Sequence, residues 1–294
     1  MPVDNESLVT DDARAFEAGL DALEAPTPPP RPGPGKVFVR SVLPPIIAVA
    51  AFVALWQLTY SAGIKESYAL PSPLDVFHTF GQTVRDGRAW QAVSISVLRG
   101  AEGFAASMVV GTVLGLAMWQ SRWLRTALGP FVSALQSLPS IAWVPAAIIW
   151  FGLSDAAIYA VVLLGAVPSI ANGLLAGFDQ VPPLLDKVGR VLGLGTVGRI
   201  WHVLLPAALP GYLAGLKQGW AFSWRSLMGA ELITYSPALG MGLGQLLDVG
   251  RELNAMDLVI ASIALILIVG VAIELLVFAP VERRCLRARG LAGS

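Results

Sequence analysis

The stretch KVGRVLGLGTVGRIWHVLLPAALP, residues 187–210, is a basic polar segment between two long apolar runs. Apolar residues recur at helical spacing on both sides of a break that contains Gly193 and Gly195. Pro206 then begins the next apolar run, where proline is tolerated because the first amide groups of a helix have no intrahelical acceptor. The pattern predicts a short amphipathic helix–turn–helix with a positive face, lying outside the bilayer.

The composition around this segment is that of an integral membrane protein. Of the 294 residues, 55% are hydrophobic and 14% are charged, whereas a soluble domain carries roughly 25% charged residues. The mean hydropathy is +0.67. We therefore expect an all-α membrane fold with about six transmembrane helices, because six runs approach the length of about 20 residues that a span needs. These runs are Val42–Tyr60, Gly103–Met118, Ala127–Phe151, Ala156–Leu175, Ala207–Leu232 and Asp257–Phe278.

The basic residues of the loops give the orientation. If six spans alternate, most Lys and Arg residues of the short loops fall on one side, which is the cytoplasmic side, together with both termini. Residues 1–36 are acidic and end in PTPPPRPGPG, so they are expected to form a disordered cytoplasmic tail. This tail is either regulatory or an extension without a role, and residues 37–294 form the transmembrane domain.

The basic segment resembles the cytoplasmic EAA loop of ABC-importer permeases. In that loop an acid-Ala-Ala triplet is followed four residues later by Gly, and a hydrophobic-x-Leu-Pro sequence comes nine residues further on. The matching residues here are Gly193, Val203, Leu205 and Pro206. The triplet itself is replaced by Lys187, Val188 and Gly189, with Asp186 as the nearby acid.

Two further runs narrow this resemblance. The sequences AGLKQGWAFSWRSLMGAELI (214–233) and GLGQLLDVGRELNAMDLV (242–259) are similar to the nitrate/sulfonate/taurine/bicarbonate branch of these permeases. The likeness covers roughly residues 70–291. It implies the type I importer (MetI-like) fold, a multi-pass location in a bacterial plasma membrane, and a transport subunit rather than an enzyme. The implied substrate is a small anion, first an aliphatic sulfonate, with nitrate, bicarbonate, taurine and a vitamin precursor as alternatives.

The resemblance also implies the partners. Two copies of the chain would form the pathway, an extracytoplasmic binding protein would deliver substrate, and cytoplasmic ATPase subunits would bind ATP and Mg²⁺. The sequence holds no GxxxxGK[ST] loop, so nucleotide hydrolysis is expected in the partner and no cofactor in this chain. The ATPase would dock on the loop at about residues 178–206. Its expected contact residues are Lys187, Val188, Gly189, Arg190, Gly193, Arg199, Ile200, Val203, Leu205 and Pro206.

Candidate pathway residues lie in the third and fifth apolar runs. Prolines and polar residues interrupt the third run, and a broken helix is tolerated where it borders protein or a wet cavity. The fifth run holds ionisable residues within apolar sequence, which suggests a functional role. The expected pathway residues are Gln136, Ser140, Trp143, Lys217, Trp220, Trp224, Arg225 and Glu231. As alternatives, Arg225 pairs internally with Glu231 or Glu274, and Lys217 extends toward the cytoplasmic surface.

Several local patterns predict packing rather than chemistry. Gly211, Gly215 and Gly219 form small-residue steps that let a neighbouring helix approach closely. Arg99 and Glu102 are three residues apart and are expected to pair at the membrane edge. The segment from Phe77 to Arg99 has amphipathic helical spacing and is expected to lie at the outer interface.

Other classes of function find little support in the sequence. His78 and His202 stand alone, so no metal site or catalytic residue is expected. Gly193, Gly195 and Gly198 spell GxGxxG without a preceding strand, which favours a turn over a dinucleotide site. The formal net charge is zero and gives no indication of nucleic-acid binding. A secondary transporter would show inverted repeats with paired broken helices, and a membrane enzyme would show clustered His, Cys or carboxylate residues.

Overall fold

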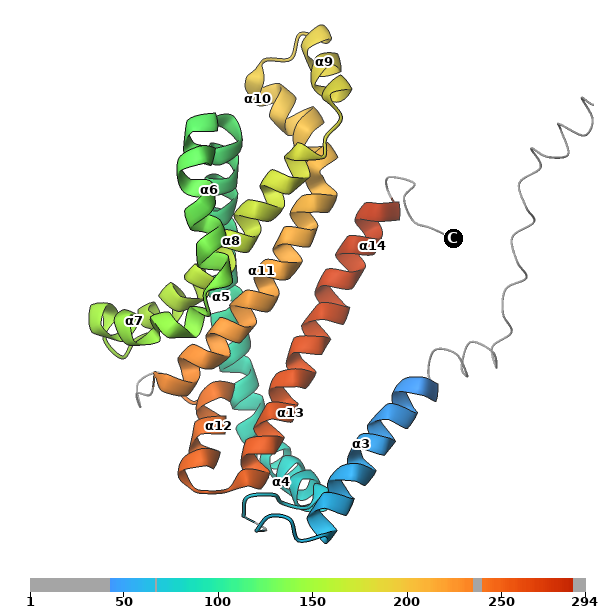
Figure 1. The fold of residues 1–294 in the computed structure, drawn as a ribbon, viewed down its shortest axis with the longest axis vertical. Helices are drawn as coiled ribbons and strands as arrows, with labels where there is room; N and C mark the ends of the chain where they lie inside the picture. The colour runs from blue at the N-terminus through green and yellow to red at the C-terminus, as the bar shows by residue number, and fades with distance from the viewer. Residues whose placement is uncertain (1–42, 67, 235–239, 288–294) are drawn as a thin grey trace, which may run out of the picture. The chain divides into compact units, whose positions relative to one another are not determined.

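A computed structural model describes residues 43–66, 68–234 and 240–287. All regular structure in these ranges is helical (Figure 1), which confirms the predicted all-α class. The expected tail, residues 1–36, lies outside them. The described chain begins with α3 (Leu43–Ser61), which corresponds to the first predicted span. The elements that follow are α4 (Pro73–Arg85), α5 (Arg88–Gln120), α6 (Arg122–Ser137), η2 (Ser140–Trp143), α7 (Val144–Phe151), α8 (Asp155–Asp179), α9 (Pro183–Val191), α10 (Thr196–Arg199), η3 (Ile200–Leu204), α11 (Leu205–Ile233), α12 (Leu243–Glu252), α13 (Met256–Ile273), η5 (Glu274–Phe278) and α14 (Ala279–Arg287).

The predicted spans differ in how apolar their helices are. Among the residues with defined structure, four helical segments are long and apolar enough to cross a membrane: α3, α5, α8 and the continuous helix from α13 into α14. The pair α6 and η2–α7 would make a fifth. The fifth predicted run instead forms α11, which has sufficient length at 29 residues but carries Lys217, Arg225 and Glu231.

The third predicted span is bent rather than straight. Its two halves, α6 and η2–α7, meet at an angle of 99°. The break falls at Leu138, whose backbone is extended (φ −80°, ψ 137°). A residue before proline is disfavoured in the helical region because the proline ring crowds its backbone, and Pro139 follows here. The predicted broken helix is therefore confirmed, and its two halves lie nearly at right angles.

The predicted outer amphipathic segment, residues 77–99, is also divided differently. Helix α4 begins with a capping box between Ser72 and Asp75 and ends at Arg85. Gly87 then adopts a left-handed conformation (φ 78°) and α5 begins at Arg88. The second half of the segment is thus the first part of the helix that forms the second span, which begins well before the predicted Gly103.

Helix α8 is the central helix, and glycines bring its neighbours close. In Figure 1 α5, α8 and α11 run alongside one another, with α9 and α10 at one end and α12 at the other. A Cβ atom added to Gly173 of α8 would lie 2.3 Å from the Cα of Gly215, and one added to Gly211 would lie 2.5 Å from the Cα of Gly177. We call these four residues the glycine seam. Its backbone contact confirms the small-residue packing predicted for the fifth run.

Candidate functional site

The loop between α8 and α11 forms the predicted helix–turn–helix. Helix α9 is followed by Gly193 with φ 73°, a conformation that glycine adopts at little cost and other residues avoid. The amide of Leu194 donates to the carbonyl of Gly189 (3.1 Å) and closes the turn. Helix α10 and the π-helical turn η3 then lead directly into α11. The loop is therefore continuous with both helices of the glycine seam.

One carboxylate holds the two short helices of the loop together. Asp186 accepts a hydrogen bond from Arg190 at 2.9 Å and forms an ion pair with Arg199 at 2.8 Å. Gly189 lets the second helix approach, since a Cβ there would lie 2.8 Å from the Cγ of Arg199. The Arg199 side chain is largely buried, whereas Arg190 and Lys187 are exposed. Of the three basic residues expected to contact a partner, Arg199 is thus used within the loop.

The loop presents an apolar surface that the described part of the chain leaves exposed. The exposed members are Leu184, Val188, Val191, Leu192, Val197 and Trp201, which we call the apolar tip. Val191 is 87% exposed and Leu192 is 69% exposed. Ile200, expected at the same surface, is instead buried with Leu204 against the end of α8. Its role is to seat the loop on α8 and α11.

Helix α11 turns its tryptophans inward. Trp220 and Trp224 are buried and stack with ring centroids 5.9 Å apart, and Phe104 of α5 contacts Trp220 edge-on. Glu231 is also buried. The uncovered side of α11 carries small and polar residues, which we call the outward stripe. Its members are Ala214, Gln218, Ala221 and Arg225.

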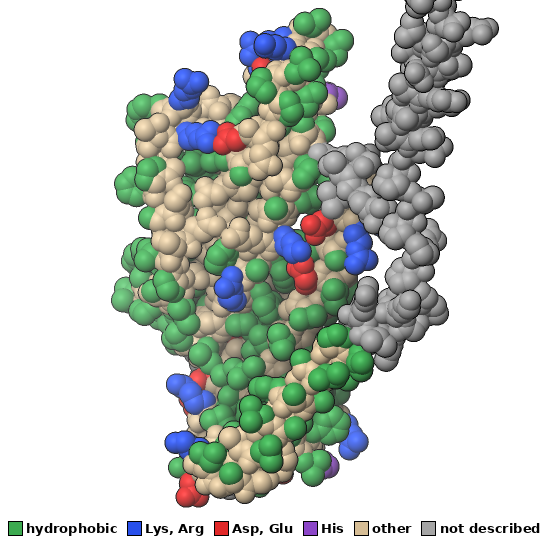
Figure 2. Space-filling view, turned by 45° about the vertical axis from the view of Figure 1, so that its right-hand side comes forward, with side chains coloured by type: hydrophobic (Ala, Val, Ile, Leu, Met, Phe, Trp, Pro, Cys, Tyr) green, Lys and Arg blue, Asp and Glu red, His purple; other side chains and the backbone are tan. Residues whose placement is uncertain are grey.

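The two cations of α11 have different surroundings. Lys217 forms ion pairs with Glu274 (2.7 Å) and Glu282 (3.4 Å). Arg225 donates from Nε to the carbonyl of Ala221 (3.1 Å), and its guanidinium lies 4.7 Å from the Phe222 ring centroid. Within the described ranges Arg225 has no carboxylate partner. Figure 2 shows that charged side chains lie among hydrophobic ones about midway along the face that it draws. The alternative pairing of Arg225 with Glu231 or Glu274 is therefore wrong, and Lys217 is paired rather than extended alone.

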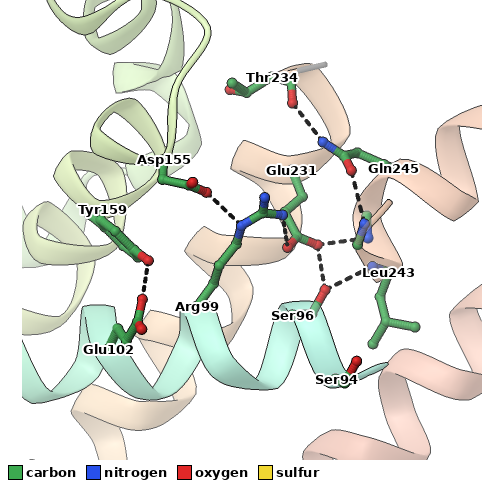
Figure 3. Close-up of polar contacts among 12 residues, drawn as sticks. Ser94, Ser96, Arg99, Glu102, Asp155, Tyr159, Glu231, Thr234, Leu243 and Gln245 are labelled. Atoms are coloured by element: carbon green, nitrogen blue, oxygen red, sulfur yellow. Dashed lines mark hydrogen bonds and ion pairs between the residues drawn. The ribbon is translucent and has the colours of Figure 1, made fainter. Parts of the chain in front are cut away.

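Glu231 belongs to a buried network (Figure 3). Its carboxylate accepts from Arg99 Nη1 (3.2 Å), Ser96 Oγ (2.7 Å) and the amide of Gly244 (3.0 Å). Arg99 Nε donates to Asp155 (2.7 Å). Four helices, α5, α8, α11 and α12, are joined at this point. We call Ser96, Arg99, Asp155 and Glu231 the Arg99 network.

The predicted pair of Arg99 with Glu102 is wrong. Glu102 accepts a hydrogen bond from the hydroxyl of Tyr159 instead. The sequence shows that Arg99 and Glu231 are unusual residues for an apolar helix, but it gives no sign that they meet. Burial explains why Arg99 pairs with Glu231 rather than with Glu102. A fully buried carboxylate is costly without a cationic or hydrogen-bonding partner, whereas Glu102 lies at an exposed position.

Polar side chains gather where the third span breaks. Gln136 of α6 accepts from the amide of Asn172 on α8 (2.7 Å). Ser140 of η2 and Ser226 of α11 share a hydrogen bond of 2.5 Å. Trp143, also expected here, is half-buried. The break is thus fixed to both helices of the glycine seam, and Asn172 and Ser226 are site residues that the sequence analysis missed. An amide within an apolar run was the available signal for Asn172.

Comparison with known proteins shows which family has this architecture. Residues 107–286 match the family described as binding-protein-dependent transport system inner membrane component. The chain is 32% identical to a putative aliphatic sulfonates transport permease protein of Escherichia coli (strain K12), over 81% of this chain and 88% of the relative. It is 30% identical to the taurine transport system permease protein of the same organism, over 80% and 86%.

Solved structures share the fold. One chain of the crystal structure of an amino acid ABC transporter aligns with a TM-score of 0.57 at 15% identity, covering 70% of this chain and 98% of that one. The methionine ABC transporter in an inward-facing conformation aligns with a TM-score of 0.51 at 21% identity, covering 67% and 94%. These likenesses confirm the predicted type I importer fold.

Proposed function

Because the chain belongs to the family of binding-protein-dependent transport system inner membrane components, we propose that it forms the membrane pathway of an ABC importer for an aliphatic sulfonate. ATP hydrolysis in a separate ATPase subunit drives transport, and an extracytoplasmic binding protein delivers the substrate. Two copies of the chain enclose the pathway, with both termini in the cytoplasm. Nitrate, bicarbonate, taurine and a vitamin precursor are the alternative substrates.

The apolar tip supports docking of an ATPase. Apolar side chains this exposed on a segment outside the membrane favour burial in a partner. Lys187 and Arg190 lie beside them and are available for polar contacts. The ion pair between Asp186 and Arg199 links the two helices of the loop, so that the tip moves as one piece. Nucleotide-driven closure of the ATPases would shift the loop and with it α8 and α11, which shifts the population between inward-open and outward-open states.

Arg225 is the single observation that supports an anion as the substrate. A cation within the membrane is costly, so it ordinarily has a carboxylate partner or faces a polar cavity. Lys217 has such partners and Arg225 has none among the residues with defined positions. The outward stripe on which Arg225 lies is small and polar, as expected of a pathway surface. An anion passing along α11 would meet the guanidinium group.

The docking role of the apolar tip is tested with Leu192→Asp. We expect this chain, purified in mild detergent, to lose its copurifying ATPase and the substrate-stimulated part of ATP hydrolysis, because the substitution places a charge in an apolar contact. Leu253→Asp is the matched control, since Leu253 is 68% exposed and lies outside the loop. Full retention of the ATPase by Leu192→Asp, or equal loss in both variants, would count against the proposal.

The role of Arg225 is tested by comparing Arg225→Gln with Lys217→Gln. Arg225→Gln should lower ATP-driven sulfonate uptake into proteoliposomes by about tenfold or more, because a hydrogen bond to a charged group contributes roughly 1.5–3 kcal/mol. Its unfolding temperature should not change, since no ion pair is broken. Lys217→Gln should lower that temperature because Glu274 and Glu282 lose their cation. If Arg225→Gln is the less stable variant, Arg225 has a structural role instead.

A further inference from the structure

A groove opens between α11 and α13 beside Arg225. Its volume is about 520 Å³, which lies within the range of small-molecule sites. Trp224 and Arg225 form one wall, and Ile263, Leu267 and Gly270 of α13 contribute to the other. Apart from Arg225 and a glutamate at its cytoplasmic end, the lining is apolar or aromatic. The groove therefore combines one unpaired cation with an extended apolar wall.

Two hydrogen-bond donors border this groove. A Cβ added to Gly270 would lie 3.2 Å from the indole Nε1 of Trp224, so this N–H group lies close to the backbone of α13 at a residue without a side chain. No residue of the described segments accepts a hydrogen bond from it. A largely buried tryptophan usually finds an acceptor for its N–H. The guanidinium of Arg225 and the indole N–H of Trp224 are thus two donors that this groove offers to an oxyanion.

The groove does not have the character of a surface that faces lipid tails. Arg225 would be costly against hydrocarbon, and Ala214, Gln218 and Ala221 continue the small, polar stripe along the same side of α11. On α13, by contrast, Ile263 and Leu267 are exposed. The two walls thus favour a ligand with an anionic head and an apolar tail.

We propose that this groove binds the transported organic anion, with its charged head at Arg225 and the indole of Trp224 and its alkyl tail along Ile263 and Leu267. This inference rests on the proposed function and extends it. The permease itself, in addition to the delivery protein, selects for an alkyl tail and against tail-less inorganic anions. The positive charge of Arg225 is complementary to the anionic head, and the apolar wall is complementary to the alkyl tail, which together favour this ligand.

The test measures binding without the delivery protein. The complex of this chain with its ATPase is placed in phosphatidylcholine nanodiscs, and quenching of tryptophan fluorescence is titrated with methanesulfonate and butane-1-sulfonate. Each buried methylene contributes about fourfold in affinity, so butane-1-sulfonate should bind at least about tenfold more tightly. Equal affinity for the two sulfonates would overturn the proposal.

Three variants test where in the groove the head and the tail of the sulfonate bind. Gly270→Leu fills the space beside Trp224, and Leu267→Ser removes apolar wall without a backbone clash. Leu267→Ser should abolish the advantage of the longer chain, whereas Gly270→Leu and Arg225→Gln act at the charged head and should weaken both sulfonates. Gly81→Ala of α4, where an added Cβ has no neighbour within 4 Å, should leave both affinities unchanged. A chain-length advantage that persists in Leu267→Ser would place the tail elsewhere and contradict the proposal.

Two further outcomes identify other occupants. Displacement of butane-1-sulfonate by phosphatidylglycerol at low mole fraction would make the groove a site for anionic lipid. Binding to the isolated chain but not to the assembled complex would mean that a second copy covers it. Either result overturns this inference while ATP-driven uptake, measured in parallel, leaves the proposed function intact. Failure of the ATPase to copurify would instead contradict the proposed function, whatever the groove binds.

Discussion

Replacing Arg99 with leucine is expected to destabilise the folded chain by about 3–5 kcal/mol, because removing one member of a buried ion pair leaves an uncompensated charge. Arg99 is 5% exposed and Glu231 is 0% exposed. Ser96 and the amide of Gly244 would still donate to the Glu231 carboxylate, but neither carries a positive charge. The Arg99 network joins four helices, so the loss should also reduce the amount of folded chain recovered from membranes.

The measurement is the thermal unfolding of detergent-solubilised chain. The double variant Arg99→Leu/Glu231→Leu should recover much of the lost stability, since replacing a buried pair by apolar groups is often neutral or stabilising. Arg88→Leu is the control, because the side chains of Arg88 and its partner Asp86 are 51% and 56% exposed. Exposed pairs contribute roughly 0–1 kcal/mol. If Arg99→Leu is as mild as this control, the network is not what joins the helices.

Gly173→Ala should be comparably severe, although it adds a single carbon atom. The new Cβ would lie 2.3 Å from the Cα of Gly215. Both atoms belong to helix backbones, so no side chain can rotate away and the helices must separate. Overpacking of this kind costs about 1–3 kcal/mol and occasionally more; we expect the upper end because the contact lies between two backbones.

Gly81→Ala, by contrast, is expected to stabilise the folded chain. Gly81 lies within helix α4 and has no neighbour within 4 Å of an added Cβ, so the variant should gain up to about 1 kcal/mol from the better helix propensity of alanine. Comparing the unfolding temperatures of the two variants separates steric conflict from propensity. Equal shifts in the same direction would show that α8 and α11 do not pack as closely as the glycine seam requires.

Features set by neighbouring residues were predictable from the sequence. The turn at Gly193, the break before Pro139 and the close packing at Gly211 and Gly215 each follow from a local pattern, because glycine and proline act on their own backbone and small residues recur at helical spacing. The all-α membrane class followed from composition. The resemblance supplied the fold, which the comparison with solved structures confirms.

Features that depend on distant segments were not predictable. Arg99 meets Asp155 and Glu231 across 56 and 132 residues of sequence, whereas the spacing argument considers only neighbours three or four residues away. The orientation of α11 about its own axis could not be predicted for the same reason. Two adjacent faces of this helix carry charged residues, and only packing against distant helices, among them α5 and α13, decides that Trp220 and Trp224 are buried while Arg225 is exposed.

The glycine seam also determines how force would travel through the chain. Helices in backbone contact at two successive steps cannot slide past one another without steric conflict, and the loop joins them rigidly at one end. A push on the apolar tip must therefore tilt α8 and α11 together as a lever. Between Leu205 and Arg225 the arm measures about 30 Å at a rise of 1.5 Å per residue. A small displacement of the apolar tip is in this way converted into a swing of Arg225 at the far end of this arm.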